Sequence, residues 1–152
     1  MQRNEPLGQA QALLYEHFGY SSFRGAQETL ISAILSGKDA LGIMPTGAGK
    51  SICYQIPGLM LPGITLVVSP LISLMQDQVR ALKAAGIAGA YLNSSLSYKQ
   101  YLRALDNARR GMYKIIYVAP ERLLTDGFLE AIQARRVDMV TVDEAHCISQ
   151  WG

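Results

Sequence analysis

One short run of residues, Met44–Ser51, constrains the fold of this chain more than any other stretch. It follows the apolar residues 40–44 and opens a helical pattern, so it is expected to join a strand to a helix. Gly47 and Gly49 allow the backbone to curl so that successive N–H groups point at one anion. The N-terminus of the following helix adds partial positive charge. This arrangement predicts a phosphate-binding loop.

The residues of the loop suit a nucleoside triphosphate. Lys50 supplies a mobile positive charge for the β- and γ-phosphates, and the Ser51 hydroxyl is placed to ligate Mg²⁺. The usual pattern begins with glycine, and here Met44 holds that position. A glycine-rich turn without a ligand is the alternative, but the strand before and the helix after favour phosphate. The predicted nucleotide-binding residues here are Met44, Pro45, Thr46, Gly47, Ala48, Gly49, Lys50 and Ser51.

Composition limits the class of protein. The chain has 152 residues, of which 49% are hydrophobic and 17% charged, which predicts one domain with a well-buried sheet. The net charge is 14 − 12 = +2, which is weak evidence for a polyanionic partner. No apolar run is long enough for a membrane span, and no signal peptide is expected. Cys53 and Cys147 lack the spacing of a zinc site or disulfide framework, so we expect buried thiols in a cytoplasmic protein.

Strand and helix patterns alternate about five times along the chain. Helices are expected over residues 7–18, 28–37, 50–60, 71–86 and 97–110, and around 128–132. Strands are expected over residues 39–44, 64–68, 88–92, 114–118 and 137–142. This alternation predicts an α/β fold with a doubly wound, mostly parallel sheet. We divide the chain into N-terminal helices, 1–37, and the first part of a nucleotide-binding domain, 38–152.

Polar motifs follow four of the expected strands. They are Thr46–Ser51, Ser69-Pro70, Pro120–Arg122 and Asp143-Glu144. Because ligands bind at the carboxyl ends of the strands in such sheets, these motifs are expected to meet at one edge.

Two acidic residues complete the predicted catalytic set. Asp143 stands at the end of a β-branched strand, where a carboxylate holds Mg²⁺ opposite a phosphate loop. Glu144 can activate or orient the attacking water. Two solvated acids after a strand are the alternative, but the phosphate loop in the same chain favours nucleotide hydrolysis. Lys50, Asp143 and Glu144 are the predicted catalytic residues.

The acidic pair also begins a recognisable motif. Asp143-Glu144-Ala145-His146 resembles the DEAH box of superfamily 2 helicases, in which a phosphate loop without its first glycine is also typical. Four stretches resemble motifs of the RecQ family of DNA helicases, namely residues 14–27, 68–75, 117–123 and 142–152. The resemblance covers about Leu14 to Gly152. It implies the first RecA-like lobe of a P-loop NTPase, ending after the DEAH box.

The resemblance assigns an adenine site to the first of these stretches. Gln27 would hydrogen-bond the adenine edge, since a planar amide pairs with an acceptor and a donor side by side. Arg24 would lie along the base or support Gln27. A solvent-exposed helix residue is the alternative for Gln27. The family commonly has Pro then Gly between these two positions, and here Gly25 and Ala26 predict a looser loop.

The resemblance also assigns a DNA-binding and coupling set. Ser69, Pro70 and the following helix start would face the DNA backbone, with help from Arg122. Trp151 would begin an aromatic-rich loop that senses single-stranded DNA by stacking. His146 would couple the Mg²⁺ site to that loop. The alternatives are a surface ion pair for Arg122, a core position for Trp151 and a packing role for His146.

The implied function is ATP-dependent unwinding of DNA with 3′–5′ polarity in repair and recombination. ATP and Mg²⁺ are the expected cofactors, and single-stranded and partly duplex DNA the expected partners. Such motors hold ATP between two RecA-like lobes, and the second supplies an arginine finger. This chain does not contain that lobe, nor the downstream domain in which alone zinc is expected. We therefore expect little ATPase and no unwinding from the isolated chain. An RNA-directed helicase, a nucleotide-gated binding module and a small-molecule kinase are the competing interpretations.

Overall fold

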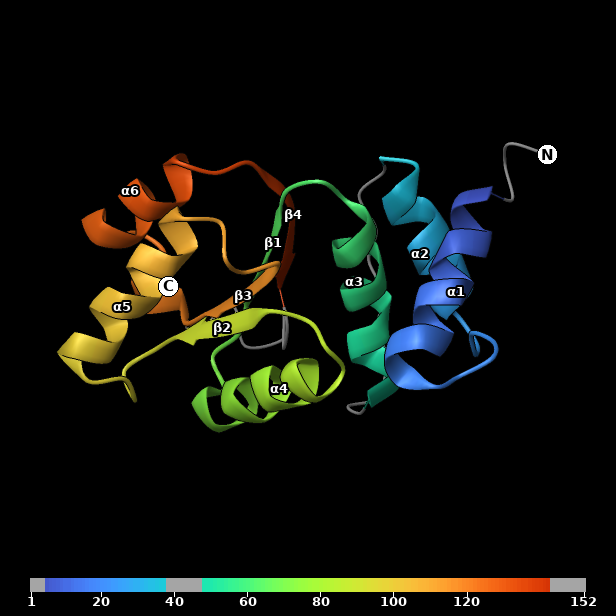
Figure 1. Cartoon of the computed structure of the whole chain (residues 1–152), viewed down its shortest axis with the longest axis horizontal. Coiled ribbons are helices and arrows are strands. Elements are labelled where there is room, and N and C mark those ends of the chain that lie inside the picture. The colour runs from blue at the N-terminus through green and yellow to red at the C-terminus, as the bar shows by residue number, and fades with distance from the viewer. Residues whose placement is uncertain (1–4, 38–47, 143–152) are drawn as a thin grey trace. The chain divides into compact units, whose positions relative to one another are not determined.

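The computed structural model of the protein describes residues 5–37 and 48–142. The backbone forms two compact units, residues 1–62 and residues 63–152, which are described here one at a time (Figure 1). The expected strand over residues 39–44 lies outside the described residues, and so does the first half of the phosphate loop, Met44–Gly47.

Helices α1 (Glu5–Phe18), α2 (Gln27–Leu35) and α3 (Ala48–Met60) build the first unit. They pack around a shared apolar core whose fully buried members are Ala10, Leu14, Ile31, Ile52 and Ile56. Helix α1 ends at Phe18, as the sequence predicts, and is followed by Gly19, which has a φ of 77° and whose N–H donates to the Tyr15 carbonyl at 3.0 Å. Helices commonly end at a residue with a left-handed backbone conformation, and glycine adopts that conformation without steric cost.

Helix α3 is buried along most of its length, from residue 51 to residue 58, as its apolar pattern predicts. From the sequence we expected Pro57 to bend or shorten it. The helix is not shortened, since it continues to Met60 and the Leu61 N–H donates to the Pro57 carbonyl at 2.9 Å. Proline removes one hydrogen-bond donor near the C-terminal end of the helix but leaves its own carbonyl available to the following turn.

A four-stranded sheet forms the second unit, in the order β2-β3-β1-β4. Its strands are β1 (Ile64–Val68), β2 (Gly89–Leu92), β3 (Ile115–Val118) and β4 (Val137–Val142). Every described pairing is parallel, with Leu66 beside Ile116 and Val140. The connections contain α4 (Ile72–Ala84), α5 (Tyr98–Arg109), the short 3₁₀ helix η1 (Pro120–Arg122) and α6 (Asp126–Gln133). The predicted parallel α/β architecture is confirmed for this part of the chain.

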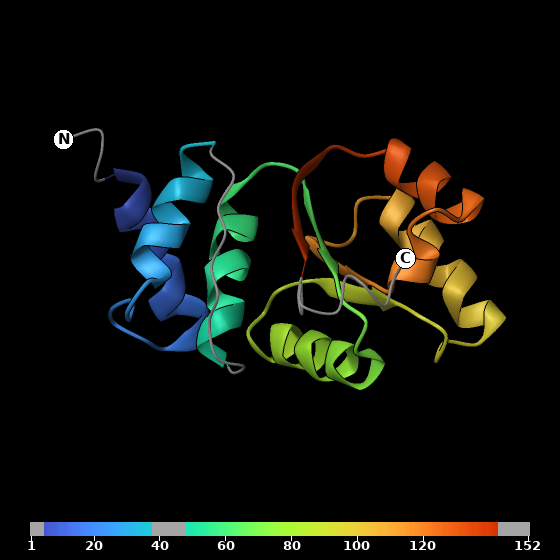
Figure 2. The ribbon, with the colours of Figure 1, turned by 180° about the vertical axis from the view of Figure 1, so that it is seen from behind.

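Helices cover both faces of this sheet (Figures 1 and 2). Helices α5 and α6 pack on one face through Leu105, Ala108, Phe128 and Ala131. Helix α4 lies on the other face, where a Cβ added at Gly89 would come within 2.8 Å of Leu82. Among the described helices, none is both long and apolar enough to cross a lipid bilayer.

Helix α4 buries fewer of its apolar residues than the spacing of those residues predicts. Leu71 and Leu74 repeat at helical spacing with the other apolar residues, yet they are 37% and 36% exposed. Only Met75 and Leu82 are buried on this helix. The helix contacts the edge strand β2, so a single line of side chains reaches the sheet. Leu71 precedes the first turn and lies beyond that line.

Candidate functional site

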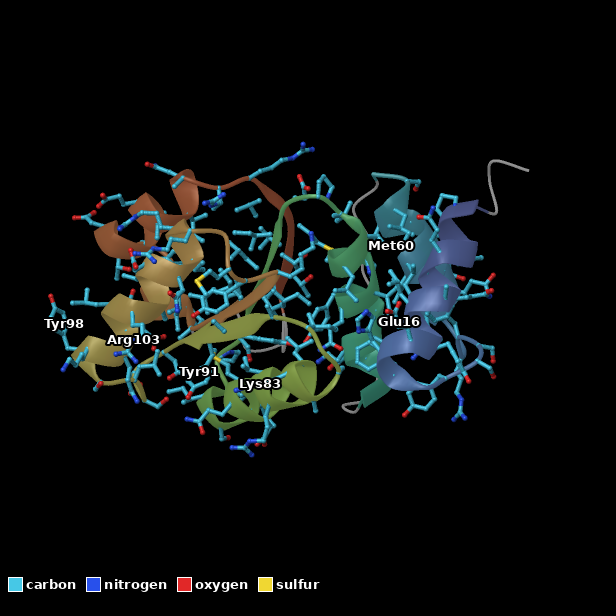
Figure 3. All side chains as sticks on the ribbon, in the orientation of Figure 1. Glu16, Met60, Lys83, Tyr91, Tyr98 and Arg103 are labelled. Atoms are coloured by element: carbon cyan, nitrogen blue, oxygen red, sulfur yellow. The ribbon has the colours of Figure 1, made fainter. Side chains whose placement is uncertain are left out.

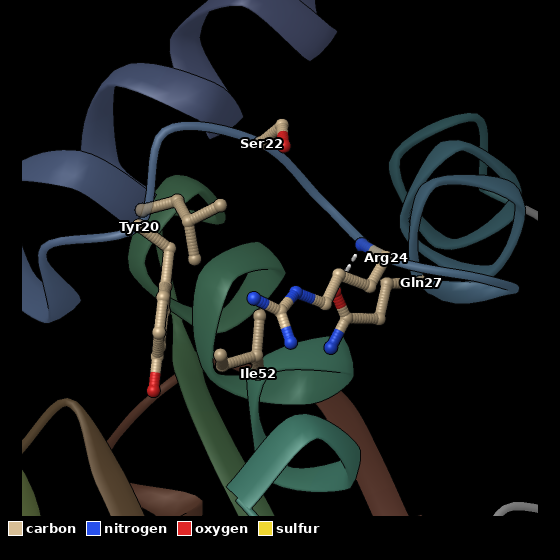
Figure 4. Close-up of a pocket in the computed structure, with 6 residues that line it drawn as sticks. Tyr20, Ser22, Arg24, Gln27 and Ile52 are labelled. Carbon is tan, nitrogen blue, oxygen red and sulfur yellow. Dashed lines mark hydrogen bonds between the residues drawn. The ribbon is translucent and has the colours of Figure 1, made fainter.

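A pocket opens in the first unit where the segment between α1 and α2 meets α3 (Figure 4). Its volume is about 110 Å³. The side chains that line it are Leu14, Tyr20, Ser22, Arg24, Gln27 and Ile52. It combines apolar walls with a few convergent polar groups, which is the composition expected of a small-molecule site.

Gln27 is held in a defined orientation at this pocket. It is only 6% exposed, which excludes the solvent-facing alternative. Its side-chain Oε1 accepts a hydrogen bond from the Arg24 backbone N–H at 2.7 Å, and the Gln27 backbone N–H donates to the Arg24 carbonyl at 3.1 Å. An amide oxygen has two lone pairs, so Oε1 can accept a second hydrogen bond from a ligand.

Gly25 gives the connecting loop its shape. Its φ is 54°, in the left-handed region, whereas a proline ring holds φ near −65°. This conformation is therefore closed to the proline that the related motif commonly has at this position. The two hydrogen bonds between Arg24 and Gln27 hold the turn that we expected to be loose.

Tyr20 is a pocket residue that the sequence interpretation missed. It lies in the loop after α1 and is 47% exposed. Figure 4 shows its ring on one side of the pocket, with the Arg24 guanidinium on the other side and Ile52 between them. An aromatic face opposite a guanidinium is suited to a flat ligand ring. The sequence feature that could have identified Tyr20 is an aromatic residue in a polar loop, four positions before Arg24.

The start of α3 adjoins this pocket, since Ile52 lines the pocket and directly follows Ser51 in the chain. Ser51 is 8% exposed and Lys50 is half-buried in the first turns of the helix. The N-terminus of a helix is a favourable place for an anion. The predicted loop residues Met44–Gly47 lie outside the described residues.

Cys53, on the same helix, is a free and buried thiol as predicted. Burial raises its pKa, which keeps the thiol protonated. A protonated, buried thiol is a poor nucleophile and a poor metal ligand.

The second unit brings three strand ends together at the carboxyl edge of its sheet. The Ser69 N–H donates to the Val118 carbonyl at 3.2 Å, and the Ala119 N–H donates to the Leu92 carbonyl at 3.0 Å. Ser69 is 2% exposed, and its Oγ accepts a hydrogen bond from the Leu71 N–H at 3.3 Å. The Ser69 hydroxyl therefore shapes the turn into α4.

Arg122 ends η1 at this edge. Its guanidinium carbon lies 4.7 Å from the centroid of the Tyr101 ring, a cation–π contact with α5. Its Nε is buried, and none of the described residues offers that atom a hydrogen-bond acceptor. The alternative of an ordinary surface ion pair does not describe this environment.

Asn93, which we assigned from the sequence only to a turn at a strand end, organises the segment after β2. Its side chain is completely buried. Its Oδ1 accepts hydrogen bonds from Ser95 N–H at 2.9 Å and Ser95 Oγ at 2.6 Å, while its Nδ2 lies 3.3 Å from Met75 Sδ. Gln76 Nε2 donates to Ser95 Oγ at 3.1 Å. These contacts join the segment to α4.

Comparison with known proteins places the chain in a family. The pattern of the DEAD/DEAH box helicases matches residues 24–152, which is most of the chain. The chain belongs to the DEAD/DEAH box helicase family. The resemblance that we inferred from the motifs is thereby confirmed at the level of the family.

Two of the similar proteins carry the name ATP-dependent DNA helicase RecQ. The chain is 50% identical over 147 residues to the ATP-dependent DNA helicase RecQ of Bacillus subtilis, covering 96% of this chain and 25% of that protein. It is 52% identical over 148 residues to the protein of the same name in Pasteurella multocida, covering 97% of this chain and 23% of the relative. The chain thus spans about a quarter of the length of these curated relatives.

Besides Met44–Gly47, four further predicted site residues of this member of the DEAD/DEAH box helicase family lie outside the described part of the chain. They are Asp143, Glu144, His146 and Trp151, which follow the end of β4 at Val142. Their roles in metal binding, hydrolysis and coupling stay predictions. Of the remaining residues, Arg24 and Gln27 share one pocket, and Ser69, Pro70 and Arg122 follow adjacent strands of one sheet.

Proposed function

We propose that the protein is an ATP-dependent DNA helicase of RecQ type. It couples ATP hydrolysis to 3′–5′ translocation on single-stranded DNA and to duplex unwinding in DNA repair and recombination. The sequence similarity to proteins named ATP-dependent DNA helicase supports this function. The structural observation that carries it is the buried, oriented carboxamide of Gln27 beside the start of α3.

In this proposal the pocket takes the adenine of ATP. The Gln27 carboxamide pairs with the N6 and N7 edge of the base, as glutamine does in other adenine contacts. Arg24 and Tyr20 lie against the faces of the ring. Because the hydrogen bond from the Arg24 N–H fixes the carboxamide beforehand, little conformational entropy is lost on binding.

The phosphates then lie at the loop before α3. The backbone of Met44–Gly49 surrounds them, and Lys50 neutralises the charge on the β- and γ-phosphates. The Ser51 hydroxyl is a hard oxygen donor in the first turns of a helix and fits Mg²⁺, with Asp143 as the second protein group. Mg²⁺ supplies charge neutralisation for the phosphate oxygens when it is bound.

Hydrolysis is an in-line attack of water on the γ-phosphorus. Glu144 orients the water and accepts its proton, the bond to the β–γ bridging oxygen breaks, and ADP leaves with the electron pair. Lys50 stabilises the negative charge that develops on the phosphates. An arginine from a second lobe would complete the site in the full-length protein.

The DNA strand runs along the carboxyl edge of the sheet in this proposal. Ser69, Pro70 and Arg122 contact its sugar-phosphate backbone, which explains binding without a long basic tract. Trp151 stacks on a base, and His146 transmits the occupancy of the strand to the ATP site.

Steady-state ATP hydrolysis by the full-length protein tests the function directly. We expect low turnover without nucleic acid and strong stimulation by single-stranded DNA, with little response to single-stranded RNA. Lys50→Ala should abolish both rates, whereas Trp151→Ala should spare the basal rate and remove the stimulation. An equal response to RNA would instead indicate an RNA-directed helicase, and no response to either would indicate a nucleotide-gated binding module.

A further inference from the structure

The short helix η1 has little intrinsic stability of its own. A 3₁₀ helix of three residues has poor hydrogen-bond geometry and few internal bonds. Its last residue, Arg122, is nevertheless fixed through both its side chain and its backbone. The side chain stacks on Tyr101 of α5, and the backbone carbonyl accepts a hydrogen bond from Thr125 Oγ1 at 2.7 Å.

The two contacts of Arg122 are connected to each other. The Tyr101 hydroxyl lies 3.5 Å from Thr125 Oγ1, and Thr125 Oγ1 donates to the Arg122 carbonyl. Together with the contact between the Tyr101 ring and the Arg122 guanidinium, these contacts form a closed network of three residues. The Thr125 N–H also donates to the Arg122 carbonyl at 3.2 Å. A side chain with the rotamer freedom of arginine is in this way restrained before any ligand arrives.

One polar atom in this network of three residues, Arg122 Nε, has no hydrogen-bond partner among the described residues. This atom is buried, which has a cost in free energy unless another group supplies an acceptor. If position 122 served only for packing, an apolar side chain could cover the Tyr101 ring without this cost. The stacked guanidinium is better explained as a group held ready for an anion.

The position of η1 suits a strand that crosses the sheet edge. It begins directly after β3, and the Ala119 N–H hydrogen bond to Leu92 places it beside the end of β2. A phosphate reaching this edge would meet a guanidinium whose direction is set by α5.

We propose that Tyr101 and Thr125 are positioning residues, which orient the Arg122 guanidinium toward a backbone phosphate of the DNA strand. This inference rests on the proposed function, in which Arg122 contacts DNA. Tyr101 acts through the face of its ring, and Thr125 acts through the main chain of η1. Neither residue touches the DNA itself.

The test uses the full-length protein and an oligothymidylate strand as the probe. The concentration of DNA that half-maximally stimulates ATP hydrolysis is measured at several salt concentrations, together with the basal rate. Tyr101→Leu should raise that concentration about two- to fivefold, the size expected from losing one cation–π contact. It should leave the basal rate unchanged. Arg122→Ala should raise that concentration as well. It should also reduce the slope of the logarithm of DNA affinity against the logarithm of salt concentration by about 0.7, because one phosphate contact is lost.

Two variants separate positioning from general stability. Tyr101→Phe keeps the ring and should restore most of the DNA response. Tyr98→Leu changes an aromatic residue on the same helix that is 78% exposed and points away from the sheet (Figure 3), so it should behave as wild type. Thr125→Val removes the hydroxyl with little change in volume and should weaken the DNA response in the same direction as Tyr101→Leu.

A double variant tests whether Tyr101 affects DNA binding through Arg122. If Tyr101 acts through Arg122, then Tyr101→Leu combined with Arg122→Ala should match Arg122→Ala alone. Additive losses, an unchanged response of Tyr101→Leu, or equal falls in the basal and stimulated rates would overturn the inference. A wild-type protein that DNA does not stimulate would overturn the proposed function itself, which is a different result.

Discussion

The Asp138 carboxylate accepts a hydrogen bond from the Gly63 N–H at 2.5 Å, joining two residues that lie 75 positions apart in the chain. Its other oxygen accepts from Arg136 Nε at 2.6 Å. The Gly63 carbonyl in turn accepts from Lys114 Nζ at 3.1 Å. The backbone entering β1 is thus held on both sides by strands β3 and β4. A side chain at position 63 would approach the Arg136 carbonyl to 2.6 Å.

This contact predicts a specific dependence of stability on pH. The Gly63 N–H, with Arg136 and Lys114, holds the pKa of Asp138 below its ordinary value of 3.8. The stabilisation is therefore complete above about pH 4 and is lost as the pH falls through the lowered pKa of the folded state. Asp138→Asn should lower the urea midpoint at pH 7, and its difference from wild type should shrink at pH 3.

Asp77→Asn is the matched control for that comparison, since Asp77 forms an exposed ion pair with Arg80 at 3.5 Å. It should change the midpoint little at any pH, because exposed pairs contribute little. A difference between Asp138→Asn and wild type that stays constant from pH 7 to pH 3 would contradict the assignment.

A second prediction concerns the buried amide at the end of β2. Asn93→Ala should destabilise the protein by about 1–3 kcal/mol, because the N–H and hydroxyl of Ser95 would lose their acceptor. Denaturant unfolding measures the change. Ser94→Ala, at the exposed neighbouring position, should leave the midpoint within about 0.5 kcal/mol of wild type. Equal effects of the two substitutions would show that the Asn93 contacts are unimportant.

The order of elements could be read from the sequence because each one carries its own local signal. A run of four β-branched residues and one leucine predicted the strand now seen as β1, and Ser97 predicted the start of α5. The reciprocal bond from the Ser97 N–H to Gln100 Oε1, at 2.9 Å, follows the same local rule. Leu71 and Leu74 failed as core residues because burial depends on how much of the sheet a helix covers.

The candidate site likewise contains residues that the sequence could indicate and residues that it could not. Arg24 and Gln27 belong to one contiguous motif, so the resemblance to the RecQ family could indicate that they act together. Tyr101 and Arg122 are 21 positions apart, on an amphipathic helix and a short turn, and nothing local indicates that they meet. For Asn93 the sequence indicated a turn after a strand, but its burial and its contacts with Met75 and Ser95 depend on residues that no local pattern identifies.

Glycine positions provide a third prediction, in which two substitutions of the same type have opposite effects. A Cβ at Gly89 would lie 2.8 Å from Leu82 Cδ1 and 3.2 Å from the Ile115 carbonyl, so Gly89→Ala should destabilise by about 1–3 kcal/mol. Gly8 lies within α1 with open space around it, so Gly8→Ala should stabilise by about 0.5–1 kcal/mol. Thermal unfolding of both variants checks the signs. Two destabilising results would mean that α1 does not form as described.

The last prediction concerns nucleotide choice at the pocket. Gln27→Ala would remove the acceptor for the Arg24 N–H as well as the proposed contact with adenine, so its effect would be ambiguous. Gln27→Glu keeps an acceptor for that N–H but replaces the amide donor with a carboxylate oxygen. It should therefore preserve the loop while losing the hydrogen bond to the acceptor N7 of adenine.

We expect Gln27→Glu to weaken ATP binding by about tenfold, the equivalent of one lost hydrogen bond, with a much smaller effect on GTP. Titration calorimetry with both nucleotides measures the ratio of affinities. Ser22→Ala alters an exposed residue at the rim of the same pocket and should leave that ratio unchanged. If Gln27→Glu bound ATP as tightly as wild type, adenine would have to be recognised elsewhere. The pocket of Tyr20, Arg24 and Gln27 would then be a structural feature of the loop.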